Sequence, residues 1–168
     1  LATGLRLVIC GSAASATSAR VGAYYAGPQN RFWLTLREVG LTPRQLAPTE
    51  FRELLQYGIG LTDIVKSQAG NDRDLRPSPS DGDDLRVRIL RYAPRILCFN
   101  GKRAAQQFLG TKTVALGLQG TEIGATRIFV APSTSAAARG HWDLDAWHAL
   151  AKLATDAAAR RPTDTESR

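Results

Sequence analysis

The chain has 168 residues, of which 43% are hydrophobic, and its formal net charge is +7. This length suits one domain, expected over residues 1–160 with a flexible tail over 161–168, and the apolar runs are too short to span a bilayer. The positive charge favours a polyanionic partner such as nucleic acid. Two cysteines, Cys10 and Cys98, are too few for an iron–sulfur cluster, and we expect buried thiols in a cytoplasmic, reducing setting.

The first half of the chain predicts two strands and two helices. An apolar, β-rich run predicts a buried strand over residues 5–10. The next residues, 11–29, are rich in glycine, proline and small side chains and predict a long functional loop. Apolar residues at helical spacing and a proline at a helix start predict helices over 30–39 and 48–55, and a short strand is expected over 59–63.

The second half continues the alternation of helices and strands. Residues 66–81 are polar with two prolines and predict an exposed loop. Helices are expected over 83–92, 101–109 and 143–160, and strands over 95–100, 114–118 and 127–131. This order predicts a single α/β domain, a three-layer sandwich with a largely parallel central sheet and helices on both faces.

In such a sheet the ligand site lies beyond the carboxyl ends of the strands. The segments expected around this mouth are 11–15, 62–63, 100–102 and 132–139. The first of them contains only tiny side chains, which lets a ligand approach the main chain closely. The aromatic-rich residues 22–33 offer a surface on which a planar ring could stack. Together they predict a pocket for a flat heterocycle beside a sugar or phosphate.

These strand-end segments resemble the mismatch-specific uracil-DNA and thymine-DNA glycosylases, one branch of the uracil-DNA glycosylase superfamily. Four pieces in family order carry the resemblance: Tyr25–Trp33, Tyr57–Thr62, Tyr92–Ile96 with Phe99–Lys102, and Pro132–Ala136 followed by Arg139. The resemblance implies a compact α/β domain that flips uracil from DNA and hydrolyses its N-glycosidic bond.

The first motif departs from the family pattern. Relatives usually read Gly-(Ile)-Asn-Pro-Gly, with the asparagine positioning the attacking water, whereas this chain has Ala13 at the asparagine position. The position after Thr62, often lysine or asparagine in relatives, is Asp63. We expect Asp63 to take over water activation, because a carboxylate can stabilise an oxocarbenium-like state and deprotonate water. The alternative is that Asp63 caps the turn that follows it.

The resemblance assigns base-binding roles to residues near the same mouth. Tyr25 is expected to stack on the flipped base, or else to pack the loop; Tyr24 is expected to pack or to bound the pocket. Asn30 contacts the base or the abasic sugar, or else caps the helix that follows it. Ser12 and Ala13 act through main-chain N–H groups that stabilise the leaving base, which is compatible with a tight turn.

The loop over 132–139 resembles the family's segment that enters the minor groove. Arg139 is expected to fill the gap left by the flipped nucleotide, and Ser133, Ser135, His141 and Lys66 to contact DNA; an ordinary surface loop is the alternative. The histidines and cysteines lack metal-ligand spacing, so we expect no metal and no cofactor.

The leading hypothesis is therefore a monofunctional uracil-DNA glycosylase, acting as a monomer on double-stranded DNA. Single-stranded DNA and related damaged bases are further candidate substrates. Because segment 11–15 holds no lysine, lyase chemistry through a Schiff base is not expected. Two alternatives stay open. Ala13 at the asparagine position would suit a non-catalytic binder of damaged DNA or abasic sites, and the pocket would also suit a small-molecule nucleoside hydrolase.

Overall fold

The computed structural model describes residues 1–66, 68–70, 78–141 and 143–159, without the side chains of 79, 139–141 and 157–159. Within them one sheet has the strand order β2-β1-β3-β5-β4. Its strands are β1 (Leu7–Gly11), β2 (Ile59–Asp63), β3 (Ile96–Asn100), β4 (Gly117–Ile123) and β5 (Thr126–Ala131). Neighbouring pairs are parallel except β4 and β5, which are antiparallel. The prediction of a largely parallel sheet is confirmed.

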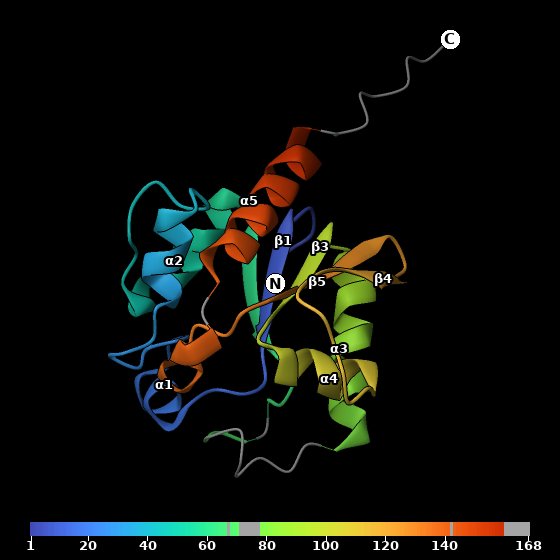
Figure 1. Ribbon diagram of the computed structural model, residues 1–168, viewed down its shortest axis with the longest axis horizontal. Coiled ribbons are helices and arrows are strands. Elements are labelled where there is room, and N and C mark those ends of the chain that lie inside the picture. Colours follow the sequence, from blue (N-terminus) through green and yellow to red (C-terminus); the bar gives the residue numbers. More distant parts are fainter. Residues whose placement is uncertain (67, 71–77, 142, 160–168) are drawn as a thin grey trace.

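Helices cover both faces of the sheet (Figure 1). Two α-helices and one 3₁₀ helix pack on one face: α2 (Phe32–Glu38), η1 (Pro48–Tyr57) and α5 (Leu144–Ala159). Two helices pack on the other: α3 (Pro79–Tyr92) and α4 (Lys102–Leu109). Two short helices, α1 (Ala16–Val21) and η2 (Ala136–His141), follow the carboxyl ends of β1 and β5. The chain is thus the three-layer α/β sandwich that the sequence predicts.

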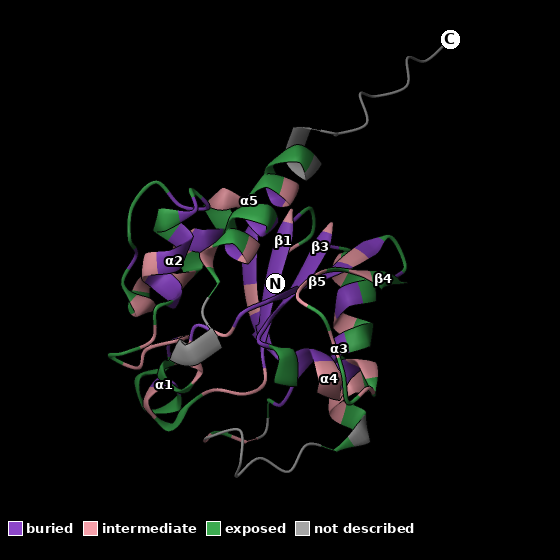
Figure 2. Ribbon diagram, in the orientation of Figure 1, coloured by how far each residue is buried: buried purple, intermediate pink, exposed green. Residues whose placement is uncertain are grey.

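Strand β1 shows why the sheet is central. All five of its residues are buried, and the side chains alternate between the two hydrophobic layers. Leu7 and Ile9 join the core under α2 and α5, whereas Val8 and Cys10 join the core under α3 and α4. Figure 2 shows buried strands between helices whose outer sides are exposed. A strand covered on both faces needs a continuous apolar run, which is the pattern that predicted it.

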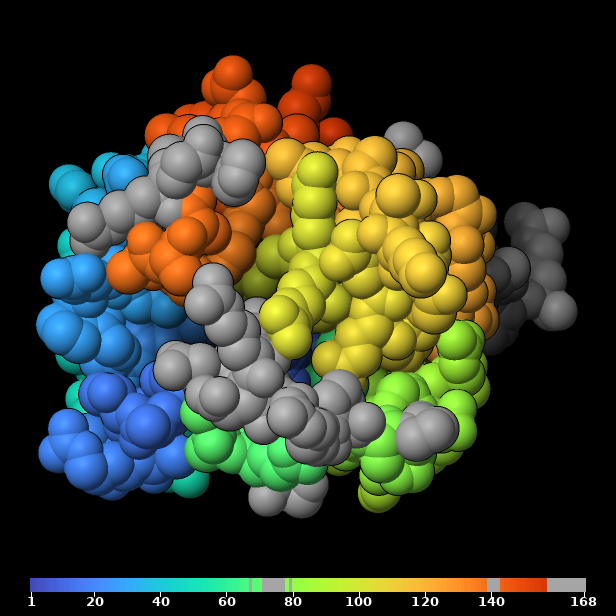
Figure 3. Space-filling model, turned by 60° about the horizontal axis from the view of Figure 1, so that its bottom comes forward, coloured from blue at the N-terminus to red at the C-terminus, as the bar shows by residue number. Residues whose placement is uncertain are grey.

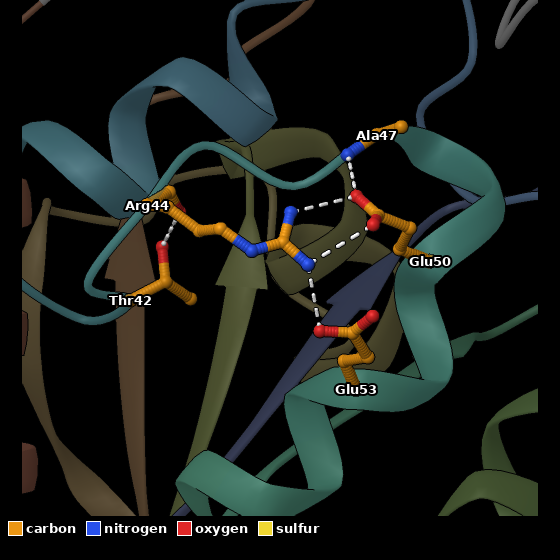
Figure 4. Close-up of polar contacts among 5 residues, drawn as sticks. All are labelled: Thr42, Arg44, Ala47, Glu50 and Glu53. Carbon is orange, nitrogen blue, oxygen red and sulfur yellow. Dashed lines mark hydrogen bonds and ion pairs between the residues drawn. The ribbon is translucent and has the colours of Figure 1, made fainter.

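The loop before η1 is held by polar contacts on the surface (Figure 4). Glu50 accepts a hydrogen bond from the Ala47 N–H at 2.7 Å and forms an ion pair with Arg44 at 2.9 Å. Arg44 also pairs with Glu53 at 2.8 Å, and its carbonyl accepts from the Thr42 hydroxyl at 2.9 Å. Exposed ion pairs of this kind contribute little stability, whereas the bond from the Ala47 N–H to Glu50 pairs a backbone group at the start of η1.

The predicted loop over 11–29 is wrong in part, because it contains α1. The Ser15 hydroxyl accepts from the Ser18 N–H at 3.1 Å and begins this helix, and Gly22, with φ of 65°, ends it. These are ordinary capping interactions, hidden in a run of small residues.

Two other elements have a boundary about four or more residues from the prediction, whereas the rest differ by about two residues or fewer. Helix α3 begins at Pro79 rather than at residue 83, since the Asp81 carboxylate accepts from the Ser78 N–H at 2.7 Å. Strand β4 spans Gly117–Ile123 instead of 114–118, because the turn at Gly124 and the antiparallel pairing with β5 set its position. The predicted tail over 161–168 lies outside the described residues. Among those described, no helix is both long and apolar enough for a membrane crossing.

Candidate active site

A cavity of about 270 Å³ opens beyond the carboxyl ends of β1 and β2. Its wall consists largely of small side chains from residues 13–15 and from α1, with Tyr24, Tyr25 and Asn30 beside them. Asp63 and Lys66 are the charged residues that line the cavity. Figure 3 turns this edge of the sheet forward and shows residues after β1, β2, β3 and β5 gathered on one face. The cavity therefore lies at the edge that the sequence predicts.

The carboxylate of Asp63 reaches this cavity because of strand alternation. Asp63 is the last residue of β2 and pairs with Gly11 at the end of β1. Two further hydrogen bonds extend the join beyond the strands, from the Ile64 N–H to the Gly11 carbonyl at 3.0 Å and from the Val65 N–H to the Ser12 carbonyl at 2.9 Å. Since neighbouring side chains point to opposite faces, Thr62 points towards α3 and Asp63 towards the α2 side.

Burial dominates the electrostatics of Asp63. The residue is only 6% exposed, and burial raises the pKa of its carboxyl group to about 6, against the opposing effects of the Lys66 and Arg88 charges. An acid with this pKa is mostly ionised at neutral pH and can still accept a proton readily, which suits a general base. The alternative role as a cap of the following turn is not seen at Ile64 and Val65, whose N–H groups donate to the carbonyls of Gly11 and Ser12.

Sequence reasoning missed Arg88, which holds the end of β2 from the far side of the sheet. From α3 its guanidinium group donates to the Thr62 hydroxyl at 2.6 Å and to the Asp63 carbonyl at 3.2 Å. Leu85 and Ile89, on either side of it, are buried in the core beneath α3. The anchoring helix is therefore fixed by packing, and Arg88 positions the backbone that carries Asp63.

Gly11 leaves the room that the Asp63 carboxylate occupies. A Cβ atom at this position would lie 2.7 Å from Asp63 Oδ1 and 3.2 Å from the Tyr25 hydroxyl oxygen. Real Cβ atoms do not approach oxygen so closely, so a side chain here would displace one of the two groups. The glycine is thus required by close approach and not by its backbone angles.

Two tyrosines form the aromatic part of the wall. The Tyr25 ring stacks on Phe32 with centroids 3.9 Å apart and an interplanar angle of 28°, and it also lines the cavity. The packing alternative for Tyr25 is therefore seen, and the stacking of a base on it stays a prediction. Lys66, which is exposed, donates to the Tyr24 hydroxyl at 3.0 Å, so Tyr24 bounds the cavity as expected.

The structure shows one of the two roles considered for Asn30. Its side-chain oxygen accepts from the Phe32 N–H at 3.0 Å, at the beginning of α2, and its side chain also lines the cavity. Asn30 thus pairs with the first N–H of α2 from the position before the N-cap residue, Arg31, and contact with a base stays a prediction. Trp33, on the same helix, fixes the entering loop by donating from its indole N–H to the Tyr24 carbonyl at 3.1 Å.

The atypical first motif lies along the cavity for most of its length. Ala13, Ala14 and Ser15 line it, whereas Ser12, predicted as a base contact, is not among its lining residues. The reason is the position of Ser12 directly after β1, where its carbonyl continues the pairing with the segment after β2. A main-chain role for Ala13 stays a prediction.

The loop after β5 is tied to the end of β3. The Asn100 amide donates to the Thr134 hydroxyl at 2.9 Å, and its oxygen accepts from the Thr134 N–H at 3.0 Å. Trp147 of α5 donates to the Pro132 carbonyl at 3.1 Å. These buried contacts fix the base of the loop, and no local sequence pattern indicates this long-range pairing.

The predicted DNA contacts of this loop are placed only in part. Ser133 and Ser135 are half-buried, with their hydroxyl oxygens 3.1 Å apart. The side chains of Arg139 and His141 lie outside the described residues, as does Trp142. Within the described part of the chain, no three His, Cys, Asp or Glu side chains gather as metal ligands would.

Comparison with known proteins agrees with this architecture. The family described as the Uracil DNA glycosylase superfamily matches residues 1–154. A solution NMR structure from Methanosarcina acetivorans, described as a "putative Uracil DNA glycosylase", superposes with a TM-score of 0.62 at 22% sequence identity. The similarity covers 92% of this chain and 94% of that one, and at this identity it establishes the fold.

Proposed function

Because the chain belongs to the uracil DNA glycosylase superfamily and is thus a DNA glycosylase, we propose that it excises uracil from DNA by hydrolysis and that Asp63 activates the water. One observation carries this proposal: a buried carboxylate with a raised pKa faces a cavity walled by small and aromatic side chains. Ala13 cannot hold a water through its side chain, whereas Asp63 can. The finer assignment to the mismatch-specific and thymine-DNA branch belongs to the same proposal.

In the proposed reaction the base is first flipped out of the duplex into the cavity. The bond between the base nitrogen and C1′ of the sugar then breaks, and its electron pair leaves with the base. Asp63, as a carboxylate, stabilises the positive charge that develops on the sugar and accepts a proton from water as the water oxygen bonds to C1′. Main-chain N–H groups near Ala13 stabilise the negative charge on the departing base.

The face around the cavity supports DNA as the substrate. Lys66 lies exposed at the mouth, and the chain as a whole carries a net charge of +7. We propose that Lys66, Ser133, Ser135, Arg139 and His141 contact the phosphate backbone or the gap left by the flipped base. Affinity for DNA is then expected to fall steeply as salt rises.

A uracil-containing duplex tests the proposal. The protein is incubated with a labelled duplex that holds one uracil opposite guanine or adenine, and abasic sites are revealed by alkali. We expect strand cleavage that depends on the uracil and persists in a chelator, with Asp63→Asn as the inactive comparison. Binding without cleavage would support the non-catalytic alternative, and hydrolysis of free deoxyuridine at a comparable rate would support the nucleoside hydrolase.

A further inference from the structure

The hydroxyl group of Tyr25 is buried next to the proposed catalytic carboxylate without a hydrogen-bond partner among the described residues. The residue is half-buried, and its hydroxyl oxygen is buried. Leaving a buried hydroxyl unpaired costs free energy, and phenylalanine would avoid that cost with the same ring. The hydroxyl therefore needs an explanation other than packing.

The backbone of Tyr25 adds a second cost at the same residue. Its φ angle is +52°, a left-handed conformation that is unfavourable for a bulky side chain. The stacked ring of Phe32, buried in the core, helps to hold Tyr25 in this conformation. The left-handed backbone of Tyr25 and the stacking of its ring on Phe32 together fix the direction in which the hydroxyl points.

That direction is towards Asp63. The two oxygens, Asp63 Oδ1 and the Tyr25 hydroxyl, approach the same side of Gly11, at 2.7 and 3.2 Å from the position of its absent Cβ. The Asn100 amide is near enough to lower the pKa of the hydroxyl, but the hydroxyl has no hydrogen-bond partner among the described residues and the amide already pairs with Thr134. A small polar molecule between Tyr25 and Asp63 would satisfy both.

We propose that Tyr25 is a second catalytic residue, whose hydroxyl holds the attacking water together with the carboxylate of Asp63. This role rests on the proposed function. The water donates one O–H to Asp63 and accepts the O–H of Tyr25, which leaves a lone pair directed at C1′. As the C1′–oxygen bond forms, the proton passes to Asp63, and Tyr25 keeps its own.

The protonation state of Tyr25 agrees with its role as a donor to the water and with the role of Asp63 as the base. Burial, with the neighbouring charge of Asp63, raises the pKa of the Tyr25 hydroxyl well above its ordinary value. The group is therefore a permanent donor at neutral pH and cannot compete with Asp63 as the base. The opposite face of its ring can still contact a base in the cavity, so the two roles of Tyr25 do not exclude each other.

The test is Tyr25→Phe, which removes a single oxygen atom and keeps the stacked ring. We expect single-turnover cleavage of the uracil duplex to fall about 10-fold, as for the loss of one hydrogen bond. Binding of a duplex with a non-cleavable uracil analogue should be unchanged, and the thermal midpoint should be unchanged or higher. Tyr57→Phe is the matched control, because Tyr57 lies just before the opposite end of β2.

The results for Tyr25→Phe decide whether the Tyr25 hydroxyl holds the attacking water. Parental cleavage by Tyr25→Phe overturns it, and so does a lower thermal midpoint with a parallel loss of cleavage, which would mean that the hydroxyl is structural. In the double variant with Asp63→Asn, the losses should be less than multiplicative, because both groups hold one water. A parent protein that binds the duplex but does not cleave it refutes the proposed function itself, and this role with it.

Discussion

The raised pKa of Asp63 makes a prediction about stability that does not depend on activity. A carboxyl group whose pKa rises on folding binds its proton more tightly in the folded state. Its contribution to stability is therefore fully present below the ordinary pKa of 3.8 and is lost as the pH rises through about 6. Asparagine at this position keeps the size of the side chain and cannot titrate.

The expected size follows from the shift. Moving from 3.8 to about 6 corresponds to about 3 kcal/mol, at about 1.4 kcal/mol for each pH unit. The full difference is reached only well below pH 3.8, so the free energy of unfolding of Asp63→Asn, relative to the parent, should rise by about 2.4 kcal/mol between pH 4 and pH 7. For a chain of this length that difference is roughly 5 to 10 °C in the thermal midpoint.

Urea or thermal unfolding of both proteins, at intervals from pH 4 to 7.5, measures this difference. The parent and the variant share all other titrating groups, so the contributions of those groups to the free energy of unfolding cancel in the difference. Asp83→Asn, an exposed carboxylate on α3, is the control and should give a much flatter difference. A difference that stays constant across the range, or that falls as the pH rises, would refute the reasoning that Asp63 is desolvated in the folded protein.

Three other substitutions test the surroundings of Asp63 and the DNA contacts. Arg88→Gln removes a charge that lowers the pKa of Asp63, so the acid side of the pH–rate profile should move to higher pH. Arg91→Gln, at an exposed position on the same helix, is the control and should leave the profile in place. Identical profiles for the two variants would exclude an electrostatic role for Arg88. Gly11→Ala should lower single-turnover cleavage by about 10²-fold, as displaced catalytic groups do, with cooperative unfolding retained; parental cleavage would show that the carboxylate needs no such room. Arg139→Ala should weaken cleavage of duplex more than of single-stranded DNA, because only a duplex stack has to be held open, and equal losses would reduce it to a phosphate contact.

The elements that the sequence predicted well are those with a strong local pattern. The strands at β1 and β3 are continuous apolar runs, and α5 places Trp147 and Leu150 in the core at helical spacing. Helix α1 was missed because its signal is one capping serine in a run of small residues. The bounds of β4 depend on its pairing with β5, which no local pattern encodes.

For the site, the sequence predicted which strand ends meet, but not how their side chains are held. The burial of Asp63 depends on the order of strands in the sheet and on the packing around the cavity. Arg88 reaches Thr62 across 26 positions of the chain, and Tyr25 approaches Gly11 through a left-handed backbone. Such contacts arise only once distant segments are packed together.

The most direct test of the account is the single-turnover rate of uracil excision as a function of pH. The rate should rise with pH as Asp63 ionises, with its half-maximum near pH 6, and this rise should disappear together with most of the activity in Asp63→Asn. A parental rate in Asp63→Asn, or a profile that the substitution leaves unchanged, would contradict the assignment of the chemistry to Asp63.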